Sequence, residues 1–112
     1  VIKSYAGAIP VWLRYCHNER VDVGVGQTVG AGEVIGEYGY TGLCDPFGVP
    51  AGSHIHLDAW VLPETIDEAE KMGFKREMTT APERWPGGHF VTNVDPTGFF
   101  TNKGLDVIKS NR

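Results

Sequence analysis

The sequence lacks several features that define common classes of protein. It contains no apolar run near 18 residues, so we predict no membrane-spanning helix. Basic residues do not dominate, because ten Lys and Arg stand against 14 Asp and Glu and the formal net charge is −4. This balance argues against a general surface for nucleic acids or anionic membranes. There is also no internal repeat of solenoid length and no low-complexity segment.

Cysteine is scarce as well. The two cysteines, Cys16 and Cys44, form no Cys-x-x-Cys motif, so the sequence offers no structural zinc knuckle. They are compatible with one disulfide in an oxidising compartment or with two reduced thiols. No Gly-x-Gly-x-x-Gly loop followed by a helix occurs, which argues against a dinucleotide-binding site.

Glycine and proline, by contrast, are abundant. The 112 residues include 15 glycines and 7 prolines, and 41% of the residues are hydrophobic. This composition is typical of short strands joined by tight turns, and the length fits one domain whose core needs no disulfide or metal. We therefore expect a mainly β domain over residues 1–112. Strands are expected at residues 1–5, 11–17, 53–60 and 89–94, with three very short strands within 21–39.

The segments between these strands are expected to be mostly turns. Residues 6–8, 18–20 and 95–98 carry turn signals, and residues 40–52 form a loop of the kind that often borders a functional site. Residues 63–73 predict one short helix, because Pro63 and acidic residues lie in its first turn and Gly73 ends it. Residues 74–88 are expected to be irregular, and the tail beyond Phe100 to be loose.

The strand expected at residues 53–60 carries the candidate site. Because side chains alternate along a strand, one face carries His54, His56, Asp58 and Trp60. The opposite face is apolar and is expected to enter the core through Ile55, Leu57, Ala59 and Val61. Two imidazoles about 7 Å apart on one strand can serve a single metal site, one as ligand and one as acid–base partner. The competing interpretation is a surface strand that carries two histidines without such a role.

Two further histidines are present. In the strand expected at 11–17, His17 shares a face with Val11, Leu13 and Tyr15, and Cys16 points away from it. This argues against a metal held jointly by Cys16 and His17. His89 follows two glycines and is expected to be solvated.

Four motifs occur in order along the chain: YCH at 15–17, VGVGQTVGAGEVIG at 23–36, GYTG at 39–42 and SHIHLD at 53–58. Together they resemble the second half of the LytM/lysostaphin-type zinc endopeptidases, which cut peptidoglycan cross-bridges. The resemblance covers residues 11–60 well. Over residues 91–100 it is weaker, with Val94-Asp95-Pro96 similar to the family's closing motif. It implies a small antiparallel barrel-sandwich hybrid in which residues 63–89, with the short helix, form an insertion after the His-x-His strand.

A similar glycine pattern occurs in biotinyl and lipoyl carrier domains, which are related barrel-sandwich structures. Those carriers need a lysine in an exposed hairpin, and this chain has none between Lys3 and Lys71. They also lack a following His-x-His. The ordered combination of motifs therefore favours the endopeptidase family.

The resemblance assigns a role to each of three histidines. His56 matches the family's zinc ligand, whereas His54 and His17 match the two histidines that line the site. Those two position or deprotonate the attacking water and stabilise the oxyanion. Zinc lowers the pKa of bound water to near 7, and a neutral imidazole can accept the proton of that water.

Part of the family's zinc site is missing. Two of its three protein ligands come from an upstream His-x-x-x-Asp motif, but here no histidine precedes His17 and Asp22 is the first aspartate. Because the chain starts at Val1, we expect a C-terminal fragment whose upstream half supplies the motif. The alternatives are a degenerate, non-catalytic module and a substitute site that uses Asp58.

The resemblance therefore predicts a zinc-dependent endopeptidase that hydrolyses peptide bonds in the stem peptides or cross-bridges of peptidoglycan. Its expected location is the extracellular space, the bacterial envelope or a phage virion, where it would act as a lysin. Expected partners are peptidoglycan and the missing upstream segment or other chains of a larger assembly, and not nucleic acid. The alternative function is a catalytically silent wall-binding or activator module.

Overall fold

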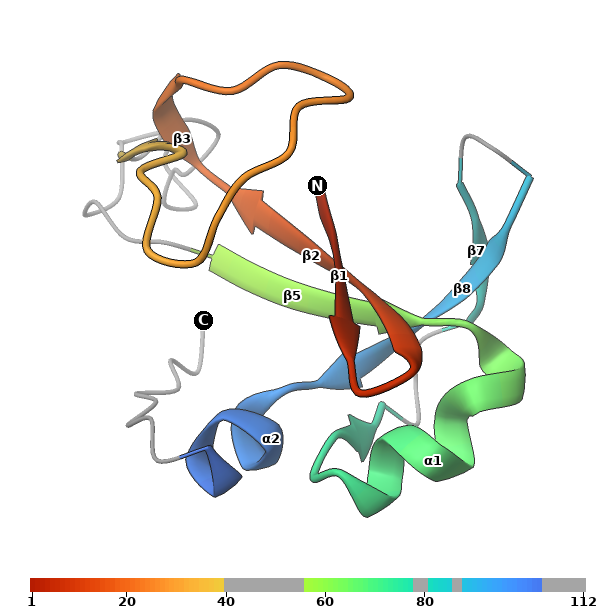
Figure 1. The fold of residues 1–112 in the computed structure, drawn as a ribbon. Helices are drawn as coiled ribbons and strands as arrows, with labels where there is room; N and C mark the ends of the chain where they lie inside the picture. Colours follow the sequence, from red (N-terminus) through yellow and green to blue (C-terminus); the bar gives the residue numbers. More distant parts are fainter. Residues whose placement is uncertain (40–55, 78–80, 86–87, 104–112) are drawn as a thin grey trace, which may run out of the picture. The chain divides into compact units, whose positions relative to one another are not determined.

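A computed structural model describes residues 1–39, 56–77, 81–85 and 88–103 of the chain (Figure 1). The described part is mainly β, as predicted, with an antiparallel six-stranded sheet, a separate two-stranded sheet and a few short helices. The chain divides into two compact units, one formed by residues 1–14 and 58–112 and the other by residues 15–57. Each unit is described by itself below.

The first unit begins with a tight hairpin. Strands β1 (Ile2–Ala6) and β2 (Ile9–Cys16) pair antiparallel, and Ala6 lies opposite Ile9. Gly7 has a φ of 61°, and Ala8 has no positive φ. A positive φ at only the first of two turn residues is the geometry of a type II′ turn, for which glycine is preferred at that position. The turn expected at residues 6–8 is therefore confirmed.

The main sheet has the strand order β1-β2-β5-β8-β6, and β7 also pairs with β8. Strands β5 (His56–Val61) and β8 (Phe90–Asp95) are antiparallel, with Ala59 opposite Val94. The strands predicted at 11–17 and 89–94 thus coincide with β2 and β8 to within two residues. The prediction for 53–60 is confirmed from His56 onward, and residues 53–55 lie outside the described part.

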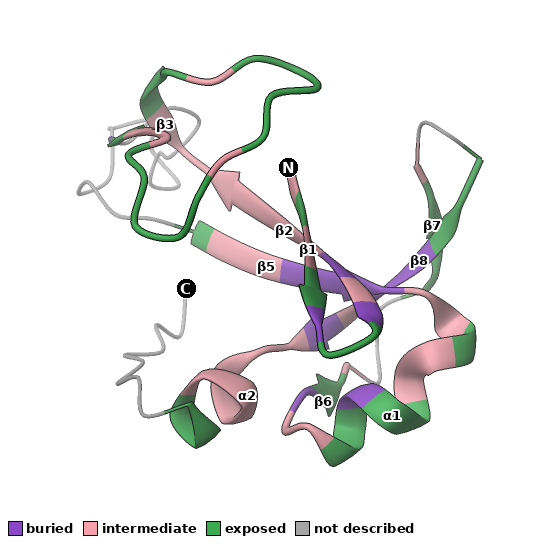
Figure 2. Cartoon of the chain, in the orientation of Figure 1, coloured by how far each residue is buried: buried purple, intermediate pink, exposed green. Residues whose placement is uncertain are grey.

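One face of this sheet, with the segments that cover it, forms the hydrophobic core (Figure 2). The alternation predicted for β5 is confirmed at Ala59 and Val61, which are both fully buried. The covering segments are η1 (Pro63–Thr65), α1 (Ile66–Lys71) and α2 (Thr97–Asn102). The buried core residues are Ala6, Ile9, Val11, Ala59, Val61, Ala69, Phe74 and Val94.

Residues 63–89, expected to be an insertion, take part in this core. The helix predicted at 63–73 is confirmed as η1 and α1, and Gly73 follows with a φ of 106°. Ala69 is fully buried and Phe74 is nearly so. A segment that supplies two core side chains contributes to the stability of the unit itself, because burying such side chains contributes about 1–3 kcal/mol each.

The region after residue 74 is more regular than predicted. Strands β6 (Lys75–Arg76) and β7 (Glu83–Arg84) both pair with β8, although residues 74–88 were expected to be irregular. Each strand is only two residues long, so no alternation can reveal it in the sequence. Its pairing depends on β8, which lies farther along the chain.

The turn expected at 95–98 is only the start of a helix. The Asp95 carboxylate accepts hydrogen bonds from the backbone N–H of Thr97, at 2.9 Å, and from its hydroxyl, at 2.6 Å. From there α2 continues to Asn102, so the prediction of a loose tail beyond Phe100 is wrong for its first two residues. The physical reason is tertiary, because Phe99 stacks on Phe74 with ring centres 4.5 Å apart.

The second unit differs more from expectation. Strand β3 (Asn18–Val21) occupies residues expected to form a turn, and it pairs with β4 (Gly36–Tyr38). Within 22–35, where further short strands were expected, the described backbone forms turns. In both turns a backbone N–H bonds to a carbonyl three residues earlier, from Gln27 to Gly24 and from Glu33 to Gly30. Val25 and Val34 are exposed, so burial against a core does not favour a strand at these two positions.

A close contact between two glycines tests this fold. A Cβ added at Gly98, near the start of α2, would overlap the backbone carbonyl oxygen of Gly73. Because backbone cannot rotate out of the way, we expect Gly98→Ala to lower the free energy of unfolding by about 1–3 kcal/mol. Urea unfolding measures the change.

The matched control is Gly24→Ala. Gly24 has no positive φ, and a Cβ there meets no atom within 4 Å. We expect its effect to stay within about 0.5 kcal/mol. Equal destabilisation by both substitutions would contradict the Gly73–Gly98 contact.

Candidate functional site

His17 lies at the junction between β2 and β3 and has an unusual backbone. Its φ is 67°, and it is the only residue other than glycine with a positive φ in the described part of the chain. The left-handed region costs most residues about 1–2 kcal/mol, although histidine enters it more often than most. A hydrogen bond from the Gly39 N–H to the His17 carbonyl oxygen, at 2.8 Å, helps to hold this conformation.

This backbone corrects one prediction. His17 was expected to continue the alternation of Val11, Leu13 and Tyr15, but regular strand geometry ends at Cys16. A residue with positive φ redirects its side chain relative to an extended strand. The direction of the His17 ring is therefore set by the β2–β3 junction and not by strand periodicity.

The ring of His17 contacts the ring of His56. Their centres are 5.7 Å apart and their planes meet at 78°, an edge-to-face arrangement. His56 is the first residue of β5 and is exposed, whereas His17 is half-buried. The structure thus brings together two of the three histidines predicted for the site, from positions far apart in the sequence. The third, His54, lies outside the described residues.

The two imidazoles of this pair are close enough to act at one site. Their ring centres are 5.7 Å apart, so one could bind a metal while the other serves as acid–base partner beside it. Within residues 1–39, 56–77, 81–85 and 88–103, no group of three His, Cys, Asp or Glu side chains is placed to hold a metal. The residues of this pair therefore fit part of a zinc site, and the described part does not complete it.

Asp58 was considered as a substitute ligand, and its contacts argue against that role. Arg14 donates to both of its oxygens, from Nε at 3.0 Å to Oδ1 and from Nη2 at 2.7 Å to Oδ2. The indole N–H of Trp60 donates to Oδ1 at 2.8 Å. A carboxylate engaged by a bidentate guanidinium and an indole is held in place as an acceptor. Asp58 thus links neighbouring strands of the sheet and is not directed at a metal.

Trp60 was expected on the same exposed face, but only 3% of it is accessible. Trp85 packs against it with ring centres 5.1 Å apart, and the Arg14 guanidinium lies 5.3 Å from its ring centre. Periodicity within one strand could not reveal this cover, because Trp85 comes from a segment later in the chain.

His89, the remaining histidine, contacts a different residue from this pair. His89 is exposed, as expected, and its ring centre lies 6.1 Å from that of Trp12. The Trp12 ring also makes a cation–π contact, with Lys3 Nζ 5.6 Å from its centre.

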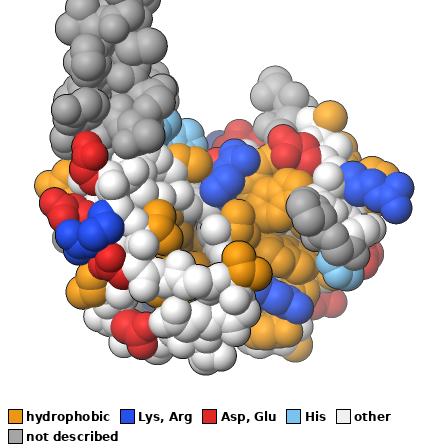
Figure 3. Space-filling model, turned by 90° about the horizontal axis from the view of Figure 1, so that it is seen from above, with side chains coloured by type: hydrophobic (Ala, Val, Ile, Leu, Met, Phe, Trp, Pro, Cys, Tyr) orange, Lys and Arg blue, Asp and Glu red, His pale blue; other side chains and the backbone are white. Residues whose placement is uncertain are grey.

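Figure 3 shows one side of the molecule, where hydrophobic side chains gather and Lys and Arg side chains border them.

Charged side chains join the two strands that follow His17. Arg20 on β3 donates to Asp22 at 2.7 Å and to Glu37 on β4 at 2.8 Å. The hydrogen bond and charge of Arg20 lower the pKa of Asp22, and Asp22 in turn raises the pKa of Arg20. Because the folded pKa of Asp22 is lowered, this pair stabilises the hairpin above the ordinary Asp pKa. The contribution is lost as pH falls through the lowered value.

Comparison with known proteins adds no relative: no protein-family model, curated protein or solved structure matches this chain. Among the helices of the described residues, none is long and apolar enough to cross a membrane.

The backbone at His17 supplies a prediction. If the left-handed conformation is imposed by the β2–β3 junction, glycine should fit this position better than alanine. We expect His17→Gly to have a higher free energy of unfolding than His17→Ala, by about 1 kcal/mol. Urea unfolding of the two variants measures the difference.

Met72→Gly and Met72→Ala, at a helix end with ordinary φ, form the comparison pair. There alanine should be the more stable of the two, because glycine has the greater unfolded-state entropy. A glycine variant that is less stable than alanine at both positions would contradict the strained backbone at His17.

Proposed function

We propose that the chain is part of a zinc-dependent endopeptidase that hydrolyses peptide bonds in peptidoglycan. The observation that best supports this is the edge-to-face contact of His17 with His56. These residues come from two separate motifs of the sequence, YCH and SHIHLD. A shared functional site explains the contact between these two histidines better than a chance placement does.

Each histidine has a defined part in this proposal. His56 supplies a nitrogen donor to zinc from the exposed start of β5. When bound, zinc lowers the pKa of a coordinated water and polarises the scissile carbonyl. His17, whose backbone is fixed by Gly39, accepts the proton of the attacking water and later stabilises developing negative charge. The same role is proposed for His54.

The proposal requires ligands beyond His56, because zinc in a catalytic site usually has three protein ligands. We propose that an upstream His-x-x-x-Asp motif supplies the other two, from a longer form of the protein or another chain of an assembly. Either a bacterial envelope enzyme or a lysin carried by a virion is compatible with the acidic composition.

A second candidate function rests on a different observation. The described residues contain a histidine pair but no complete set of metal ligands. This favours a catalytically silent wall-binding or activator module as the alternative. The two proposals differ in zinc content and in the release of peptides from purified cell walls.

Substitution of the histidines tests the proposed activity in the longest natural form of the protein. We expect His56→Ala to lose bound zinc, and His17→Ala to keep zinc but lose about 10²–10⁴-fold in peptide release from purified sacculi. Metal analysis by mass spectrometry and chromatography of released peptides provide the two measurements.

His89→Ala is the matched control, because His89 is exposed and contacts Trp12 instead of the histidine pair. It should retain zinc and activity. If the wild-type protein does not bind zinc and does not release peptides, the silent module is favoured. Full activity in His56→Ala would contradict the assignment of its ligand role.

A further inference from the structure

Strand β1 lies at the end of the main sheet. It pairs with β2 along its whole length, from Ile2 opposite Leu13 to Ala6 opposite Ile9. In the part of the chain that the structure describes, the strand order places no strand on its other side. An edge strand of this kind presents unpaired N–H and C=O groups to which an extended segment can add.

The hairpin geometry identifies which backbone groups face outward. In a two-residue hairpin, the residues that flank the turn form a hydrogen-bonded pair, and such pairs alternate with non-hydrogen-bonded ones. Ala6 and Ile9 flank the turn, so Tyr5 opposite Pro10 is a non-hydrogen-bonded pair. Pro10 agrees with this assignment because proline has no N–H to donate. The backbone groups of Lys3 and Tyr5 therefore point away from β2.

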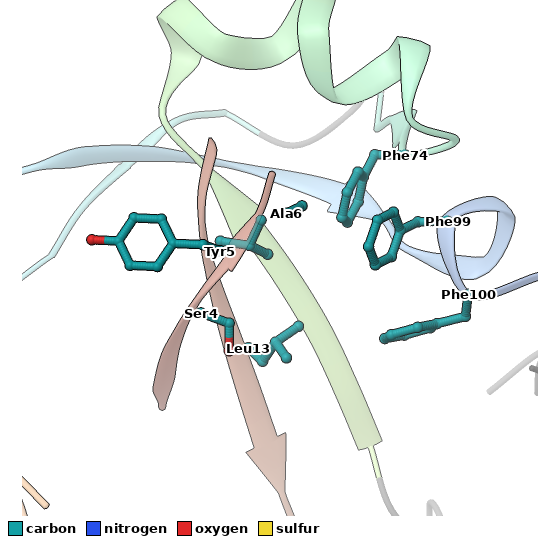
Figure 4. A pocket seen from close by; sticks show the side chains of 8 residues that line it. Ser4, Tyr5, Ala6, Leu13, Phe74, Phe99 and Phe100 are labelled. Atoms are coloured by element: carbon teal, nitrogen blue, oxygen red, sulfur yellow. The ribbon is translucent and has the colours of Figure 1, made fainter. Parts of the chain in front are cut away.

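An apolar pocket lies beside the inner face of the same strand (Figure 4). Phe74 and Phe99 are stacked on one another, Phe100 and Leu13 complete the wall, and the ring of Tyr5 points away. The cavity has a volume of about 50 Å³ and is partly open to solvent. Small-molecule sites usually occupy about 300–1,000 Å³, so this cavity suits part of one apolar side chain and not a whole ligand. From β1 it is bordered by Ser4 and Ala6.

Two lysines lie near this region. Lys3 Nζ lies 5.5 Å from the centre of the Tyr5 ring, and Lys103 Nζ lies 5.6 Å from the centre of the Phe99 ring. Among the described residues, no acidic side chain lines the pocket. In a chain whose net charge is −4, a border of two lysines is complementary to a partner with acidic side chains.

We propose that the outer edge of β1 binds an extended acidic peptide as an antiparallel strand, which places one apolar side chain in the pocket beside Phe99. Peptide residues opposite Ser4 share its face of the sheet, so their side chains enter the pocket. Residues opposite Lys3 and Tyr5 exchange backbone hydrogen bonds with them and share the other face, where acidic side chains meet Lys3. The recognised pattern is an alternation of apolar and acidic residues. This inference does not depend on the endopeptidase proposal.

A synthetic peptide tests the site directly. The probe is an acetylated and amidated hexapeptide of alternating glutamate and leucine, titrated into the full 112-residue chain and followed by amide and aromatic NMR spectra. We expect saturable shifts centred on the amides of Lys3 and Tyr5 and on the rings of Phe99 and Phe100. A peptide with lysine in place of glutamate should bind about tenfold more weakly or worse.

Backbone methylation separates strand addition from simple hydrophobic contact. N-methylation of the glutamate amides removes the donors that face β1, whereas N-methylation of the leucine amides leaves them intact. The first peptide should lose about tenfold or more in affinity relative to the second. Equal affinities, or shifts confined to other parts of the chain, would overturn the proposal.

Substitutions in the protein provide the reciprocal comparison. Tyr5→Pro removes an outward N–H without removing a bond to β2, and Tyr5→Ala keeps that N–H while removing the ring. We expect about tenfold weaker peptide binding for the proline variant and little change for alanine. If Tyr5→Pro does not fold, the methylated peptides still decide the question. Sedimentation showing that β1 pairs with a second copy of the chain, and excludes the peptide, would overturn the proposal.

Discussion

An ion pair between Arg14 and Asp58 links β2 to β5, two neighbouring strands of the main sheet, through hydrogen bonds as short as 2.7 Å. Only 15% of the Asp58 side chain is exposed, so loss of Arg14 would leave a carboxylate poorly solvated, at a cost of about 1–3 kcal/mol. The same pair orients Trp60 through its indole N–H.

Local patterns in the sequence predicted the parts of the fold that local forces determine. Alternation identified the buried residues of β5, and proline with acidic residues identified η1 and α1. The same patterns could not identify α2, because its extension depends on the stacking of Phe99 on Phe74. Nor could they predict that Trp60 is buried, since its cover comes from Arg14 and Trp85. These errors share one cause, which is contact between segments distant in sequence.

At the candidate site, too, the sequence patterns identified residues but not the contacts made between distant segments. The motifs selected His17 and His56, but strand periodicity gave His17 the wrong backbone and therefore no reliable direction. Its φ of 67° arises from the junction between β2 and β3, where Gly39 donates to its carbonyl oxygen. Asp58 was placed on the histidine-bearing face by alternation alone. Its partner Arg14 could not be inferred, because the register of β2 against β5 is a property of the assembled sheet.

The contact between Gly73 and Gly98 has a consequence for how this chain can vary. At the start of α2 the Gly98 backbone packs directly on the Gly73 carbonyl oxygen. A methyl group at Gly98 would press on that backbone, whereas substitutions at exposed positions of α2 leave this contact in place. Phe99 and Phe100 follow immediately and line the apolar pocket. The shape of the pocket therefore depends in part on two glycines that do not line it.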